Sequence, residues 1–125
     1  MITGFEHVHM MFANLEEARK YFVNILGGRE VARGEIRGMP VIRVNVAGIV
    51  FILHTADAQA PQFETGKGIR GLDHVGFLVK DIEKTVAEMK QKGAHFSQEV
   101  KTTGDGVKFT YVDGPEGIRF ELMEK

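Results

Sequence analysis

The sequence predicts an α+β fold in which one βαβββ module occurs twice, with the two modules forming a cup-shaped, partly closed mixed sheet and the helices outside. The prediction rests on an internal repeat: Gly4-Phe5-Glu6-His7-Val8 returns as Gly71-Leu72-Asp73-His74-Val75, and the run 48–53 returns as 117–122. Each copy of the first repeat also leads into an acidic segment with helical spacing. The length of 125 residues fits a single domain, so we expect a first module near 1–56, a linker near 57–70 and a second module near 71–125.

The first module is predicted from its hydrophobic spacing. Alternation over residues 5–12 indicates a half-buried strand. Asn14 then caps a helix, and Glu17, three residues later, completes a capping-box-like pair. Apolar residues recur at helical spacing from Leu15 to Ile25, until Gly27-Gly28 ends the run. Strand patterns follow near 29–36, 40–46 and 49–55.

The second module repeats this order. Residues 56–70 are polar, contain Pro61, and show no period, which is typical of a linker. A strand is expected over 72–79, then a helix over 82–92 with Asp81 as its cap. The remaining strands are predicted near 95–101, 107–112 and 118–124.

Alternation within the strands separates a face that meets the helix from an open face. The apolar set of each strand is expected against the helix. The open faces then receive four of the five histidines and one carboxylate: His7, His9, His54, His74 and Glu121. His95 lies beside a helix-to-strand junction, where we expect a surface or loop histidine.

The composition excludes several classes of function. The 16 basic and 17 acidic residues give no field that recruits nucleic acid or an anionic membrane. The absence of cysteine rules out disulfides and thiolate metal sites. The N-terminus lacks a signal-peptide pattern, and no apolar run approaches the ~18 residues of a membrane helix. We therefore expect a cytoplasmic protein.

Two histidines and a carboxylate form a set that suits Fe, Mn, Ni, Co or Zn and leaves positions open for a substrate. A single histidine in such a place is more often a hydrogen-bonded interior residue, and Glu121 alone fits an ion pair with Arg119. The repeat places the residues together, and the joint pattern favours a divalent metal.

The duplicated order, the Glu-His-Val and Asp-His-Val openings and the closing Asp-Gly-Pro-Glu-Gly-Ile-Arg-Phe-Glu-Leu resemble the vicinal oxygen chelate superfamily. Its members include glyoxalase I, methylmalonyl-CoA epimerase, fosfomycin-resistance enzymes, extradiol dioxygenases and bleomycin-binding proteins. The resemblance implies His7, His74 and Glu121 as metal ligands. The fourth position of glyoxalase I falls on Ile52, which cannot ligate, so His54 or His9 is left as a substitute ligand.

The resemblance further implies a metal-dependent isomerase or lyase of the glyoxalase or epimerase type. Its small oxygenated substrate binds through vicinal oxygens and reacts by proton transfer through an enediolate or enolate. Glu121 is expected to transfer the proton, with His54 or His9 as a second acid or base. The alternatives are an Fe(II) extradiol dioxygenase that uses the same three ligands, and a non-enzymatic bleomycin-binding module.

Two further expectations concern binding. Relatives with two modules per chain are commonly dimers, so the resemblance implies a homodimer. Arg37, Arg43 and Arg119 can each meet an anionic substrate group or remain solvated. Glu35 is better explained as an exposed charge between Arg33 and Arg37 than as a catalytic base.

Overall fold

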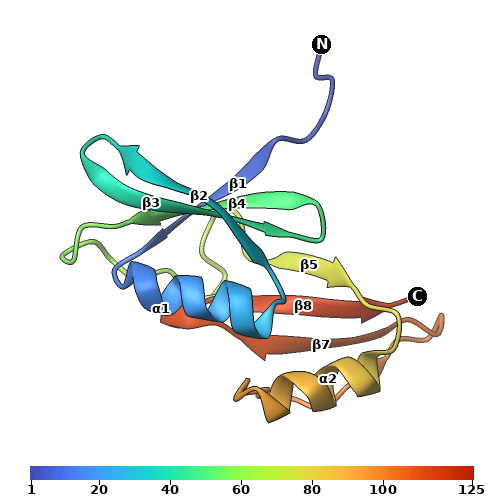
Figure 1. Cartoon of the computed structure of the whole chain (residues 1–125). Coiled ribbons are helices and arrows are strands. Elements are labelled where there is room, and N and C mark those ends of the chain that lie inside the picture. The colour runs from blue at the N-terminus through green and yellow to red at the C-terminus, as the bar shows by residue number, and fades with distance from the viewer. The chain divides into compact units, whose positions relative to one another are not determined.

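The computed structural model describes residues 1–125 and divides the chain into two compact units, Met1–Ala60 and Pro61–Lys125. Each unit contains a four-stranded mixed sheet with a βαβββ-like order, as the sequence predicts (Figure 1). The first unit contains β1 (His7–Phe12), α1 (Leu15–Lys20), a π-helical turn η1 (Tyr21–Ile25), β2 (Arg29–Ile36), β3 (Met39–Val46) and β4 (Ile49–Thr55).

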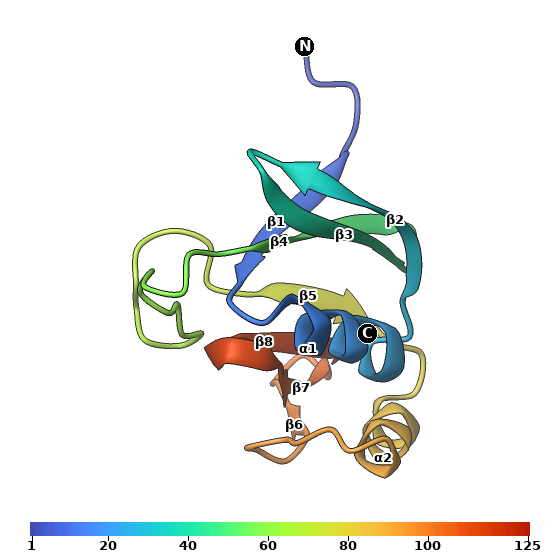
Figure 2. The same ribbon diagram turned by 60° about the vertical axis from the view of Figure 1, so that its left-hand side comes forward.

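The second unit follows a long irregular segment after β4, seen in Figure 2 as the green-to-yellow loop that leads to β5. Its elements are β5 (Val75–Leu78), α2 (Ile82–Gln91), β6 (Lys101–Thr102), β7 (Lys108–Asp113), a 3₁₀ turn η2 (Pro115–Gly117) and β8 (Arg119–Glu124). No helix in the chain is both long and apolar enough to cross a membrane.

The two sheets have the same topology. Their strand orders are β1-β4-β3-β2 and β5-β8-β7-β6. In each sheet the first strand runs parallel to the last strand, and the other pairs are antiparallel. The first and last strands of a module are therefore neighbours, which brings its two repeated motifs onto adjacent strands: 4–8 with 48–53 in the first module, and 71–75 with 117–122 in the second.

The helical segment after β1 begins as predicted and then changes its hydrogen bonding. The Asn14 side chain accepts a hydrogen bond from the backbone N–H of Glu17 at 3.1 Å, which is an N-cap. From Tyr21 the helix widens into a π-helical turn, where the sequence predicts a continuous α-helix. Gly28 then packs where a Cβ atom would lie 2.6 Å from Val44, so the chain needs a glycine at this close approach.

The core of each unit lies between its helix and one face of its sheet. In the first unit Phe22 contacts Phe12 and Phe51, with ring centroids 6.1 and 5.3 Å away. In the second unit Ile82 of α2 and Phe120 of β8 are fully buried. These are the apolar faces that strand alternation predicts.

One predicted strand is wrong over most of its length, and another is shorter than expected. Of the stretch 95–101 only Lys101 pairs with β7, together with Thr102 just beyond it. The backbone before them bonds irregularly: the His95 carbonyl accepts from the N–H of Asp113, and the Gln98 carbonyl accepts from the Thr110 hydroxyl. The strand expected over 72–79 forms only within β5, since the Asp73 carbonyl is bonded to the Thr65 hydroxyl.

Candidate metal centre

In the second unit the structure brings together His74 and Glu121. His74 directly precedes β5, and the β5–β8 pairing sets Gly76, two residues after His74, opposite Glu121. The His74 Nε2 atom lies 3.0 Å from Glu121 Oε1. Both side chains are half-buried, 27% exposed for His74 and 17% for Glu121, so they are shielded and still reachable.

Asp73 holds the other nitrogen of the His74 ring. Its Oδ2 atom lies 2.8 Å from His74 Nδ1, and its Oδ1 atom accepts from the Gly66 N–H at 2.9 Å. The bond to His74 is the main cause of a lowered pKa of Asp73. In return Asp73, and then Glu121, raise the pKa of His74 despite the opposing effect of burial. The three side chains form one charge-assisted network.

Tyr111 completes the surroundings of this pair. It lies opposite Glu121 in the β7–β8 register, and its ring meets that of His74 edge-on at 5.2 Å between centroids. Burial, followed by the charges of Glu121 and Asp73, raises the pKa of Tyr111. Sequence reasoning missed Asp73 and Tyr111 as members of the site. The available signals were the acidic residue before each repeated histidine, and alternation along the neighbouring strand.

The first unit presents the corresponding histidine in the same way. His7 opens β1, and its Nδ1 atom lies 2.6 Å from Glu6 Oε1. The acidic residue before each repeated histidine therefore bonds Nδ1 in both units. In each case this directs Nε2 as the nitrogen available to a ligand.

His9 and His54 lie on the same sheet and bond to each other. His9 Nε2 is 2.9 Å from His54 Nδ1, and His54 Nε2 is 3.2 Å from the Ile36 carbonyl oxygen. His54 is 1% exposed, and both of its ring nitrogens have partners. Burial is the largest cause of the lowered pKa of His9, followed by its neighbours His54 and His7. Ile52, opposite His9 in the register, is a buried apolar residue.

The residues of the second unit fit a divalent metal. Imidazole nitrogen and carboxylate oxygen suit Mn, Fe, Co, Ni and Zn. A carboxylate on the far nitrogen of a ligating histidine is the usual outer partner in metal sites. With metal–ligand bonds of ~2.1 Å at right angles, adjacent ligand atoms are about 3 Å apart, as are His74 Nε2 and Glu121 Oε1 at 3.0 Å.

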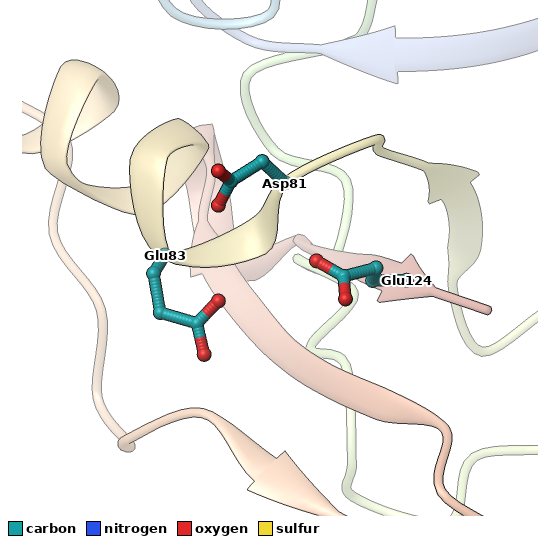
Figure 3. A group of neighbouring side chains, drawn as sticks. All are labelled: Asp81, Glu83 and Glu124. Carbon is teal, nitrogen blue, oxygen red and sulfur yellow. The ribbon is translucent and has the colours of Figure 1, made fainter.

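A separate acidic cluster lies at the start of α2 and consists of Asp81, Glu83 and Glu124 (Figure 3). Its carboxylates are used within the fold: Asp81 caps α2 as predicted, and Glu124 accepts from the Ile82 N–H at 2.9 Å. Lys108 lies 3.3 Å from Glu83 and 4.0 Å from Glu124. The cluster contains no histidine. His95 is the exposed loop residue that was expected and pairs with Asp113.

Comparison with known proteins finds a relative that matches the whole chain and another that matches part of it. "Uncharacterized protein YwkD" of Bacillus subtilis is 23% identical over 128 residues, which covers 100% of this chain and 99% of the relative. "Probable lactoylglutathione lyase, chloroplastic" of Arabidopsis thaliana is 36% identical over 56 residues, 44% of this chain and 16% of that protein.

Among solved structures, the fosfomycin resistance protein FosX of Listeria monocytogenes has the same fold. Its TM-score is 0.80 at 16% identity, and the match covers 100% of this chain and 95% of FosX. Other structures of FosX contain Mn(II) with a sulfate ion or with 1S,2S-dihydroxypropylphosphonic acid. The model of one protein family matches residues 4–122. The chain belongs to the Glyoxalase/Bleomycin resistance protein/Dioxygenase superfamily.

Proposed function

We propose that this protein is a metal-dependent isomerase or lyase of the glyoxalase or epimerase type, and that His7, His74 and Glu121 hold its divalent ion. The observation that carries the proposal is the repeated acid–histidine pair, Glu6–His7 and Asp73–His74, each bonded through Nδ1. The similarity to a lactoylglutathione lyase and to FosX, which has been seen with Mn(II), supports it.

The ion, when bound, supplies Lewis-acid stabilisation of the negative charge that develops on two vicinal oxygens of the substrate. The chain supplies the positions and the protons. Asp73 orients His74 through Nδ1, and Glu6 does the same for His7. The Tyr111 ring packs against the ring of His74, and the half-burial of His74 and Glu121 limits the access of water to them.

Proton transfer is assigned to Glu121 and His9. The Glu121 carboxylate removes a proton from the carbon next to the substrate carbonyl and returns it to the adjacent carbon; in an epimerisation the second acid instead delivers a proton to the opposite face of the same carbon. The net reaction then neither gains nor loses atoms. His9 is the second acid or base, because its Nδ1 atom has no hydrogen-bond partner in the protein and its lowered pKa keeps the ring neutral near pH 7. His54 acts through His9, since both of its nitrogens are bonded.

The metal assignment is tested by elemental analysis of purified wild-type protein and of the variants His7→Ala, His74→Ala and Glu121→Gln. We expect about one divalent ion per chain in the wild type and a large loss in each variant. His95→Ala serves as the control, because His95 is an exposed loop residue that pairs only with Asp113. A wild-type protein that binds none of Ni, Mn, Zn, Co or Fe, in analysis or in thermal shift, refutes the proposal.

The reaction class is tested with the metal-loaded protein in D₂O. The probe is the hemithioacetal formed from methylglyoxal and glutathione, followed by NMR. An isomerase or lyase of this type exchanges or transfers the proton next to the carbonyl, and Glu121→Gln abolishes that signal. Oxygen uptake with catechol on the Fe(II)-loaded protein, without such proton transfer, selects the dioxygenase instead.

A further inference from the structure

The first unit carries a partly buried arginine on the same face of its sheet as the candidate metal ligand. The register sets Arg43 of β3 opposite Ile52 of β4, and Ile52 opposite His9 of β1. Residues that are directly opposite in neighbouring strands share a face of the sheet. Arg43 therefore lies in one row with His9, next to the row of His7, at about 10 Å across two strand spacings.

Arg43 differs from the other partly buried arginines in having no partner. The guanidinium of Arg19 bonds Glu16, and that of Arg119 donates to the Thr65 carbonyl at 2.9 Å. Arg43 is half-buried, yet it forms neither an ion pair nor a hydrogen bond within the protein. A guanidinium has five N–H donors, and withdrawing it from water without an acceptor is unfavourable.

Arg37 adds a second positive charge beside this row. It follows Ile36, whose carbonyl holds the ring of His54, and it has a positive φ of 50° in the turn between β2 and β3. The turn that carries Arg37 therefore lies beside the His9–His54 pair.

We propose that Arg43, assisted by Arg37, binds an oxyanionic group of the substrate: a carboxylate, phosphate or phosphonate. The planar guanidinium matches such groups with two parallel N–H···O bonds. The inference rests on the proposed function only for the other end of the substrate, whose vicinal oxygens bind the ion that His7 of the same sheet helps to hold. A separation of about 10 Å between the strands that carry His7 and Arg43 suits a short-chain substrate with its anion several bonds from the reacting carbon.

The test uses metal-free protein, so that an anion cannot be bound by the metal, and inorganic phosphate as the probe in calorimetry or NMR titration. We expect saturable binding by the wild type and a loss of at least about tenfold in Arg43→Met, which keeps the apolar stem over Ile52. Arg33→Met is the matched control: it removes a guanidinium from the same sheet, but one that already bonds Glu16 and Glu30. Sodium acetate as a second probe separates a carboxylate from a phosphate preference.

Unchanged phosphate affinity in Arg43→Met, or an equal loss in Arg33→Met, overturns the inference. Arg43→Lys is expected to be intermediate, because it retains the charge without the planar fork. Far-UV circular dichroism and thermal unfolding of each variant identify a loss that comes from misfolding. Metal content distinguishes the two proposals: Arg43→Met keeps the metal if the metal site is correct, and His74→Ala keeps phosphate binding even if the metal site is wrong.

Discussion

The hydrogen bonds of the His9–His54 pair decide which nitrogen of each ring carries the proton. The Ile36 carbonyl can only accept, so the proton of a neutral His54 lies on Nε2. Nδ1 of His54 is then an acceptor, and Nε2–H of His9 donates to it. The lone pair of His9 is left on Nδ1, where a proton or a substrate group can be accepted.

Two substitutions of His54 distinguish the effects of its two hydrogen bonds, the one to His9 and the one to Ile36. In His54→Asn the side-chain oxygen takes the place of Nδ1, so the bond from His9 is kept and the bond to Ile36 is lost. In His54→Gln the amide takes the place of Nε2, so the bond to Ile36 is kept and the bond from His9 is lost. We expect ¹⁵N NMR to show His9 in the Nε2–H tautomer in wild type and in His54→Asn, and in mixed tautomers in His54→Gln. In His54→Gln we also expect kcat to be lower by about tenfold, the equivalent of one hydrogen bond. Identical tautomers in both variants would contradict this role.

The network around His74 predicts how the stability of the metal-free protein changes with pH. The pKa of His74 is raised in the folded state, first by the bond to Asp73 and then by Glu121. The folded state therefore binds the proton more tightly than the unfolded state. This contribution is complete below the ordinary histidine pKa near 6.5 and is lost as the pH rises through the raised folded value.

Urea unfolding of metal-free protein between pH 5.5 and pH 8.5 measures this effect. We expect the free energy of unfolding to fall across that range more steeply in wild type than in His74→Gln, which cannot titrate. Asp73→Asn should also flatten the curve, because Asp73 is the largest cause of the shift. A wild-type curve as flat as that of His74→Gln would show that the network is not formed in solution.

At the scale of elements, Thr65 ties the segment before β5 to β8. Its side chain is 2% exposed, accepts from the Arg119 N–H at 3.0 Å and donates to the Asp73 carbonyl at 3.1 Å. The neighbouring Gly66 N–H bonds the Asp73 carboxylate. The segment therefore holds Asp73 in place, and Asp73 orients His74.

Replacing Thr65 by valine keeps the shape and removes the hydroxyl. The partly buried Arg119 N–H and Asp73 carbonyl then lose their partner, which we expect to cost about 1–3 kcal/mol of unfolding free energy. Thr65→Ser retains the hydroxyl and is the control. If Asp73 acts through this segment, metal affinity also falls in Thr65→Val and not in Thr65→Ser. Equal unfolding free energies for the two variants would exclude the role.

The elements were predictable where one local pattern determines them. The alternation of β1 and the caps Asn14 and Asp81 are properties of adjacent residues, and each appears where expected. The stretch 95–100 failed because its carbonyls bond the Asp113 N–H and the Thr110 hydroxyl, partners that sequence spacing does not show. The π-helical turn at Tyr21 likewise departs from the helical spacing of its own residues.

The residues of the candidate site likewise include some that a local pattern predicts and some that it does not. Alternation brought His7, His9 and His54 to one face, and the structure joins them there through ring contacts and a hydrogen bond. The contact of Tyr111 with His74 depends on the register of β7 with β8, which no local pattern encodes. Arg43 was recognised as a possible anion site, but its lack of a partner is visible only in the folded chain.

At the scale of the whole molecule, the proposed ligands come from both compact units: His7 from the first, and His74 and Glu121 from the second. An ion bound by all three stabilises the folded state by mass action, by about 2.7 kcal/mol at a free concentration 100 times the dissociation constant. For a chain of this length that corresponds to a rise in melting temperature of about 10 °C.

Thermal unfolding with and without saturating Mn(II) measures this coupling. We expect the rise in wild type and in His95→Ala, and its loss in His7→Ala as well as in His74→Ala, because the ion then lacks a ligand from one unit. A rise that survives in His7→Ala but not in His74→Ala would place the ion on the second unit alone. The repeated histidine of the first unit would then have a different role.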